Sequence, residues 1–119
     1  MTTAPSSPEL EPGQVWSFKS AKPTTAKVVI GKLDDLHGVP IVHVSIIDIP
    51  RAAGQPGDAE TTYIGHAPFD RTALVSSLDS CVGHAHTLDD DFSDSIEQWR
   101  AAGGGVWTIG VADLIRTIL

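Results

Sequence analysis

The sequence predicts an α+β protein, in which a twisted or partly rolled antiparallel sheet of about five strands is covered by two to three helices. Two observations carry this prediction. Strand-like runs rich in Val, Ile and Thr fill the first half of the chain, whereas apolar residues recur at helical spacing in the second half. Short links with turn residues separate the strand-like runs, so neighbouring strands are expected to pair antiparallel. Such segregation of strands and helices favours an α+β fold over a doubly wound α/β sheet.

The length and composition predict one domain. The chain has 119 residues, of which 41% are hydrophobic and 19% are charged. These values are typical of a globular protein that can bury a single core. Residues 1–13 contain three prolines and no apolar periodicity, so we expect a disordered tail there and a single α+β domain over residues 14–119.

The central strand is predicted over residues 39–49, the longest β-branched run in the chain. Val42, Val44 and Ile46 alternate along it, and we expect their face to lie in the main core. The opposite face carries His43 and is expected to be partly covered.

Three further strands are predicted before and after this one. Residues 15–18 alternate between apolar and polar side chains, which predicts a short first strand. Residues 26–33 form the second, and the turn residues at 34–38 should join it to the central strand as an antiparallel hairpin. After a loop rich in Gly and Pro, residues 60–66 are expected to return as a fourth strand.

Apolar residues recur at helical spacing in three later segments. We predict helices over 71–82, from Ser93 or Asp94 to the glycines at 103–105, and over 111–119. Asp70 is placed to cap the first helix, and Cys81 continues the apolar stripe of this helix and should be buried. The β-branched residues at 106–109 predict a fifth strand, whose pairing partner does not follow from the sequence.

The charge balance argues against nucleic acid as a partner. Eight Lys and Arg stand against fifteen Asp and Glu, a formal net charge of −7, whereas DNA affinity depends on clustered basic side chains. A basic protein partner is more compatible with this charge.

The chain is predicted to be cytoplasmic and to make no membrane contact. It shows no basic stretch followed by an apolar run at its start, and no apolar run approaches the roughly 20 residues that span a bilayer. The single cysteine, Cys81, cannot form an internal disulfide, so nothing asks for an oxidising compartment.

No metal, cofactor or catalytic residue is assigned. His84 and His86, followed by three aspartates at 89–91, are metal-ligand types, but their spacing matches no recognised metal motif and the segment is expected to be a loop. Cys81 and His84 have the residue types of a thiolate and its base, which is the alternative to a buried cysteine. Neither a Walker loop nor a dinucleotide fingerprint occurs in the chain.

His43, Tyr63 and His66 are the candidate ligand-binding residues. His43 lies on the less apolar face of the central strand, and His66 lies at the end of the fourth strand, before the first helix. If the two strands pair, these three side chains can edge one pocket. The alternative is that His66 only bonds the backbone or caps the helix entry.

Four segments resemble a group of small bacterial proteins of unknown activity. They are the opening Gly13-Gln14-Val15-Trp16, then Ile41-Val42-His43-Val44, His66-Ala67-Pro68-Phe69, and the closing Gly105-Val106-Trp107-Thr108-Ile109. In that group the closing strand has Phe where this chain has Trp107. The resemblance implies no activity, but His43 and His66 both fall within the matching segments.

Two functions from different classes are expected. The first is a small cytoplasmic bacterial protein that is not an enzyme and acts by protein–protein contact through its acidic surface, as an immunity protein or an inhibitor does. The alternative is a small-ligand-binding or hydrolytic protein that uses His43, Tyr63 and His66. Pairing at a free sheet edge would also allow a homodimer.

Overall fold

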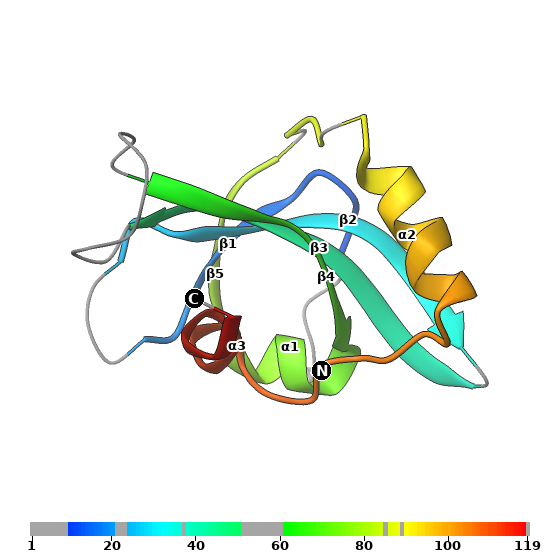
Figure 1. Cartoon of the computed structure of the whole chain (residues 1–119). Coiled ribbons are helices and arrows are strands. Elements are labelled where there is room, and N and C mark those ends of the chain that lie inside the picture. Colours follow the sequence, from blue (N-terminus) through cyan, green and yellow to red (C-terminus); the bar gives the residue numbers. More distant parts are fainter. Residues whose placement is uncertain are drawn as a thin grey trace, which may run out of the picture.

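The structure is a computed structural model and describes residues 10–20, 24–36, 38–50, 61–84, 86–88 and 90–118. In this part of the chain, one open antiparallel sheet has the strand order β4-β3-β2-β1-β5, and three helices pack on it (Figure 1). The strands are β1 (Val15–Phe18), β2 (Lys27–Leu36), β3 (Val39–Pro50), β4 (Thr61–Asp70) and β5 (Leu78–Gly83). The helices are α1 (Arg71–Ser77), α2 (Phe92–Ala101) and α3 (Val111–Ile118). The predicted α+β class is confirmed.

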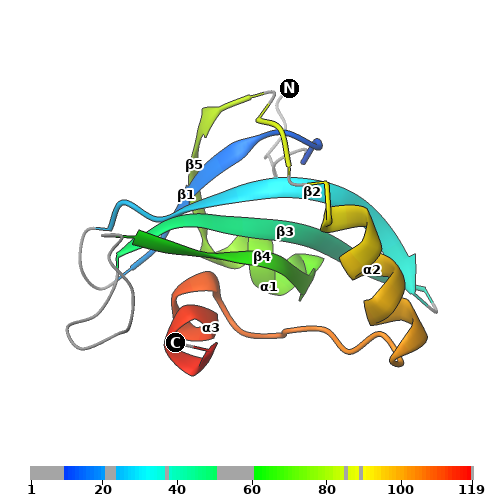
Figure 2. The same ribbon diagram turned by 45° about the horizontal axis from the view of Figure 1, so that its top comes forward.

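The helices divide between the two faces of the sheet. Figures 1 and 2 show α1 and α3 together on one face and α2 over one end of the other. The core lies under α1 and α3, where Leu74 and Leu114 pack against Val28, Val44 and Phe69 with almost no exposed surface. We call the opposite side of the sheet the α2 face.

β3, predicted as the central strand, is an inner strand with a neighbour on each side, although the middle strand of the five is β2. It joins β2 as the predicted antiparallel hairpin and β4 as a second antiparallel pair. Val42, Val44 and Ile46 are fully buried on the core face, as their alternation predicts. His43 and Ser45 point to the α2 face and are also buried.

The first predicted helix is too long. Asp70 caps it as expected, its carboxylate accepting a hydrogen bond from the amide of Ala73 at 3.0 Å, but the helix ends at Ser77. Residues 78–83 form β5 instead, paired antiparallel with β1. Four consecutive residues of this stretch, Asp79, Ser80, Cys81 and Val82, are weak helix formers, and the stretch pairs with the edge of β1 that β2 leaves open.

Cys81 is exposed, so the prediction of a buried cysteine is wrong. That prediction depended on a helix in which Cys81 followed Leu74 and Leu78. In the extended β5 strand only Leu78 reaches the core, and Val82 is 54% exposed.

The strand predicted at 106–109 is reduced to one bridge. Trp107 pairs in parallel with Phe69, its amide donating to the carbonyl of Pro68 at 2.9 Å. Its own carbonyl accepts from the amide of Asp70, also at 2.9 Å. β4 reaches this point because it continues to Asp70, four residues beyond the predicted end.

The ordered packing begins before the predicted domain boundary at residue 14. Leu10 is 4% exposed and belongs to the core, and the amide of Gly13 donates to the carbonyl of Ile30 at 2.7 Å. The remainder of the predicted tail, residues 1–9, lies outside the described residues. Within the described part of the chain, no helix is long and apolar enough to cross a membrane.

Candidate functional site

A bulge in β2 brings Asp34 onto the sheet face that carries His43. The register of β2 against β3 shifts directly after Ile30, where Gly31 is the extra residue. One extra residue in a strand turns the side chains that follow to the opposite face. Asp34, which would otherwise share the core face with Ile30, therefore lies beside His43 on the α2 face.

Gly31 also leaves the space in which α2 packs. A Cβ atom on this residue would lie 2.2 Å from Cζ and 2.4 Å from Cε2 of Phe92, the first residue of α2. Non-bonded carbon atoms do not approach so closely. Trp99 lies two helical turns after Phe92 and so on the same side of α2. The absence of a side chain at Gly31 thus allows both aromatic rings to reach the sheet.

The two aromatic rings of α2 cover His43 and His66. The ring of Phe92 meets the His66 ring nearly at right angles, with the centroids 5.5 Å apart. The ring of Trp99 meets His43 in the same way at 4.7 Å. The side chain of His43 is completely buried, whereas His66 keeps partial exposure.

A chain of hydrogen bonds runs from Arg100 to His66. Arg100 Nη2 donates to Asp34 Oδ2 at 2.8 Å, and His43 Nε2 lies 3.0 Å from the same oxygen. His43 Nδ1 in turn lies 2.8 Å from His66 Nε2. The two imidazole rings are inclined by only 22°, which allows this contact to form in the plane of both rings.

The charge on Asp34 sets the direction of the whole chain. Burial alone would raise the pKa of Asp34, but the amide of Asp35, the His43 ring and Arg100 together lower it to about 2. A carboxylate only accepts hydrogen bonds, so His43 must donate from Nε2. In a neutral His43 ring Nδ1 is then the acceptor, and His66 must donate to it from Nε2.

Both histidines are neutral near pH 7. Burial lowers the pKa of His43, against the opposing effect of Asp34. Burial, together with the charge of a protonated His43, lowers the pKa of His66 to about 4. A neutral His66 that donates from Nε2 has an unprotonated Nδ1. Within the part of the chain that the structure describes, no hydrogen bond reaches this nitrogen.

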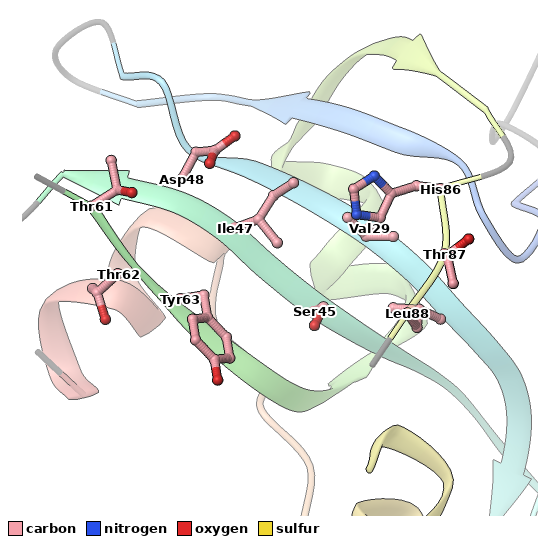
Figure 3. A pocket seen from close by; sticks show the side chains of 10 residues that line it. All are labelled: Val29, Ser45, Ile47, Asp48, Thr61, Thr62, Tyr63, His86, Thr87 and Leu88. Atoms are coloured by element: carbon pink, nitrogen blue, oxygen red, sulfur yellow. The ribbon is translucent and has the colours of Figure 1, made fainter. Parts of the chain in front are cut away.

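Tyr63 does not join the two histidines. It is 61% exposed and lines a separate pocket of about 340 Å³, of which neither His43 nor His66 is a lining residue (Figure 3). The pocket adjoins the histidines, because Ser45 lines it and donates from Oγ to the carbonyl of Gly65 at 2.7 Å. Of the three residues singled out from the sequence, the structure thus brings together two and places the third next to them.

The second group of polar residues lies elsewhere. Cys81 Sγ is 4.0 Å from His84 Nε2 on the exposed β5 edge, whereas His86 lines the same pocket as Tyr63. Among the described residues, no three His, Cys, Asp or Glu side chains gather so that they could hold a metal ion.

Sequence reasoning missed Asp34, Trp99 and Arg100 as members of the site. Asp34 was assigned to a turn, although β2 continues to Leu36. The available signal was Gly31, because a glycine inside a β-branched run often marks a bulge or a close approach of another element. A bulge at that position would have moved Asp34 to the face of His43.

In three comparisons, no family model, no curated protein and no solved structure matches the chain. The resemblance to a group of small bacterial proteins stays a prediction, and the function is argued from the geometry of the site.

Proposed function

We propose that the protein binds a small molecule at His66, whose Nδ1 accepts a hydrogen bond from the ligand. The observation that carries this proposal is the fixed direction of the Asp34–His43–His66 chain. The carboxylate holds His43 as a donor, and His43 holds His66 as a donor from Nε2. The free end of the chain is therefore an oriented acceptor on a half-buried side chain.

The cost of the arrangement supports a functional role. A partly buried ionised carboxylate with one buried and one half-buried imidazole is at best weakly stabilising compared with apolar side chains of similar volume. Shifted pKa values of this kind cluster at binding and catalytic sites. In this protein Phe92 and Trp99 of α2 pack on these polar side chains, where an ordinary helix–sheet interface would have apolar ones.

Binding is favoured over the hydrolytic alternative. A general base works best when its pKa is near the operating pH. His66, with a pKa of about 4, is a weak base at neutral pH, but its ring remains an uncharged acceptor there. The low pKa of His66 thus makes it a poor general base and keeps its ring nitrogen available as a hydrogen-bond acceptor at neutral pH.

Native mass spectrometry of protein isolated gently from its own cells tests this proposal. The wild type should retain a small molecule, and His66→Gln should lose it. Glutamine keeps an amide donor for His43 Nδ1 but removes the acceptor at the ring Nδ1 position. His84→Gln, which changes an exposed histidine outside the chain of hydrogen bonds, is the control. An equal amount of the same ligand on the wild type and His66→Gln would contradict the proposal.

A second candidate is contact with a basic protein in the cytoplasm. Its support is the net charge of −7 and the β5 edge, where Asp79, Ser80, Cys81 and Val82 are all exposed. A strand edge of this kind can pair with another chain, including a second copy of this one. Light scattering and co-purification at low and high salt test it. A monomer that binds no protein at low salt would rule it out.

A further inference from the structure

The pocket that adjoins His66 is lined at one end by an irregular part of β3. Between Ile46 and Ile49 the register of β3 against β4 shifts, and Asp48 has a φ of 54°. Ile47 and Asp48 both line the pocket, although consecutive residues of a regular strand point to opposite faces. Bulges and positive φ values outside glycine occur preferentially next to functional sites. In Figure 3 this irregular end of β3 forms one end of the pocket.

The polar groups of the pocket are mainly hydroxyls, together with one carboxylate and the imidazole of His86. The hydroxyl-bearing residues that line it are Ser45, Thr61, Thr62, Tyr63 and Thr87, and Asp48 adds a carboxylate. Among its described lining residues none is Lys or Arg. From these described residues an anionic ligand would gain no lysine or arginine, and it would face Asp48. Hydroxyl groups of a ligand, by contrast, can both donate to the carboxylate and exchange hydrogen bonds with threonine side chains.

Tyr63 supplies an aromatic surface to the same pocket. Its side chain is 61% exposed, and it stands on β4 across from the segment 86–88 (Figure 3). Exposed tyrosine offers an apolar ring face together with a polar hydroxyl. The C–H face of a saturated ring stacks on such a surface while its hydroxyls reach the polar rim. The volume of about 340 Å³ lies at the small end of ligand pockets and suits one such ring.

We infer that the ligand is an uncharged polyhydroxylated molecule, such as a sugar or cyclitol, that stacks on Tyr63 and binds the hydroxyl and carboxylate groups of this pocket. The inference rests on the proposed function, because it names the class of ligand that would reach His66 from the adjoining pocket. Ser45 and Gly65 form the shared wall, since Ser45 Oγ donates to the Gly65 carbonyl and His66 follows directly. His66 does not line the pocket, so the ligand has to extend past Ser45 and Gly65 to present a hydroxyl to His66 Nδ1.

Ligand-observed and amide-detected NMR on the full chain test the inference. The probes are D-glucose, D-galactose, D-ribose and myo-inositol, with glucose 6-phosphate as the anionic comparison. At least one neutral probe should bind and shift the amides of Ser45, Tyr63 and Thr87. Tyr63→Ala should weaken that binding tenfold or more, whereas Tyr63→Phe, which keeps the ring face, should retain most of it. Val82→Ala, which removes an exposed apolar side chain on β5, should change nothing.

Two results would overturn the inference. One is that no neutral probe shifts the three amides, and the other is that glucose 6-phosphate binds at least as tightly as glucose. Neither result depends on His66. A neutral probe that needs Tyr63 but binds His66→Gln as well as wild type would keep the ligand class and reject the role of His66. A retained ligand that is anionic and needs His66 would keep the role of His66 and reject the ligand class.

Discussion

The ring of Phe92 occupies the space that a side chain at position 31 would need, and Gly31 has none. A Cβ atom at Gly31 would lie 2.2 Å from Phe92 Cζ. The same glycine is the extra residue of the bulge that turns Asp34 toward His43. Gly31 thus both allows α2 to pack on the sheet and turns the Asp34 carboxylate toward His43. The helix that covers the histidines and the carboxylate that binds His43 therefore both depend on this residue.

Gly31→Ala should therefore destabilise the protein by about 1–3 kcal/mol, the usual cost of forcing an extra methyl into a packed site. The new methyl group must displace the ring of Phe92, which is 7% exposed and has little room to move. Urea unfolding at pH 7 measures the loss. Gly105→Ala is the matched control, because a Cβ there meets nothing within 4 Å, and it should stay within about 0.5 kcal/mol of wild type. Equal stability of the two variants would show that Gly31 is not needed for the packing of Phe92.

Asp34→Asn should cost about 2–3 kcal/mol of stability. It removes the charge that pairs with Arg100 and holds the fully buried His43 ring as a donor, and breaking such a partly buried charged contact leaves its partners under-satisfied. The measurement is again the urea midpoint. Asp79→Asn, an exposed aspartate on β5, should be close to neutral. A loss no larger than that of Asp79→Asn would mean that Asp34 does not hold the site.

Stability should fall as the pH is lowered from 6.5 to 4. In this window the unfolded chain protonates His66, whose ordinary pKa is 6.5, whereas folded His66 has a pKa of about 4. The contribution of His66 to the free energy of unfolding is therefore fully present above pH 6.5 and is lost by about pH 4. The lowered pKa of His43 acts in the same direction. Asp34 contributes only further down, between pH 3.8 and about 2, and does not mask the histidines.

Urea midpoints between pH 7 and pH 4.5 measure this dependence, and His66→Gln isolates it. The variant should lose less stability over the window than the wild type does, because one of the titrating groups is gone. His84→Gln should behave as wild type. Parallel curves for the wild type and His66→Gln would show that His66 does not carry the lowered pKa.

Cys81 should react with a thiol reagent in the native protein. The cysteine is the only one in the chain and is exposed on β5, so the reaction needs no unfolding. We expect the rate in buffer to be within about tenfold of the rate in urea, since access to the thiolate controls it. A thiol that reacts only after unfolding would contradict the exposed β5 strand and favour the buried helical position predicted from the sequence.

The sequence-based prediction succeeds where side-chain alternation alone decides the structure. Val42, Val44 and Ile46 are buried on one face as predicted, and Asp70 caps α1. The three glycines end α2 because Gly103 and Gly104 adopt φ values of 110° and 70°, which other residues rarely adopt.

The prediction fails where a distant partner decides. Leu78, Cys81 and Val82 have helical spacing, but residues 78–83 pair with the edge of β1 that β2 leaves open. Tertiary pairing of this kind overrides local preference. The same holds for the site. His43 and His66 could be named from their strands, whereas Asp34 and Arg100 join them only through the bulge at Gly31 and the docking of α2.

The tautomer of His66 is the most direct test of the hydrogen-bond direction from Asp34 through His43 to His66. Long-range ¹H–¹⁵N correlation spectra of the labelled protein at pH 7 report which ring nitrogen carries the proton. We expect a neutral ring with the proton on Nε2 and none on Nδ1, because Asp34 and His43 fix the donor direction. A proton on Nδ1, or a positively charged ring at pH 7, would contradict it.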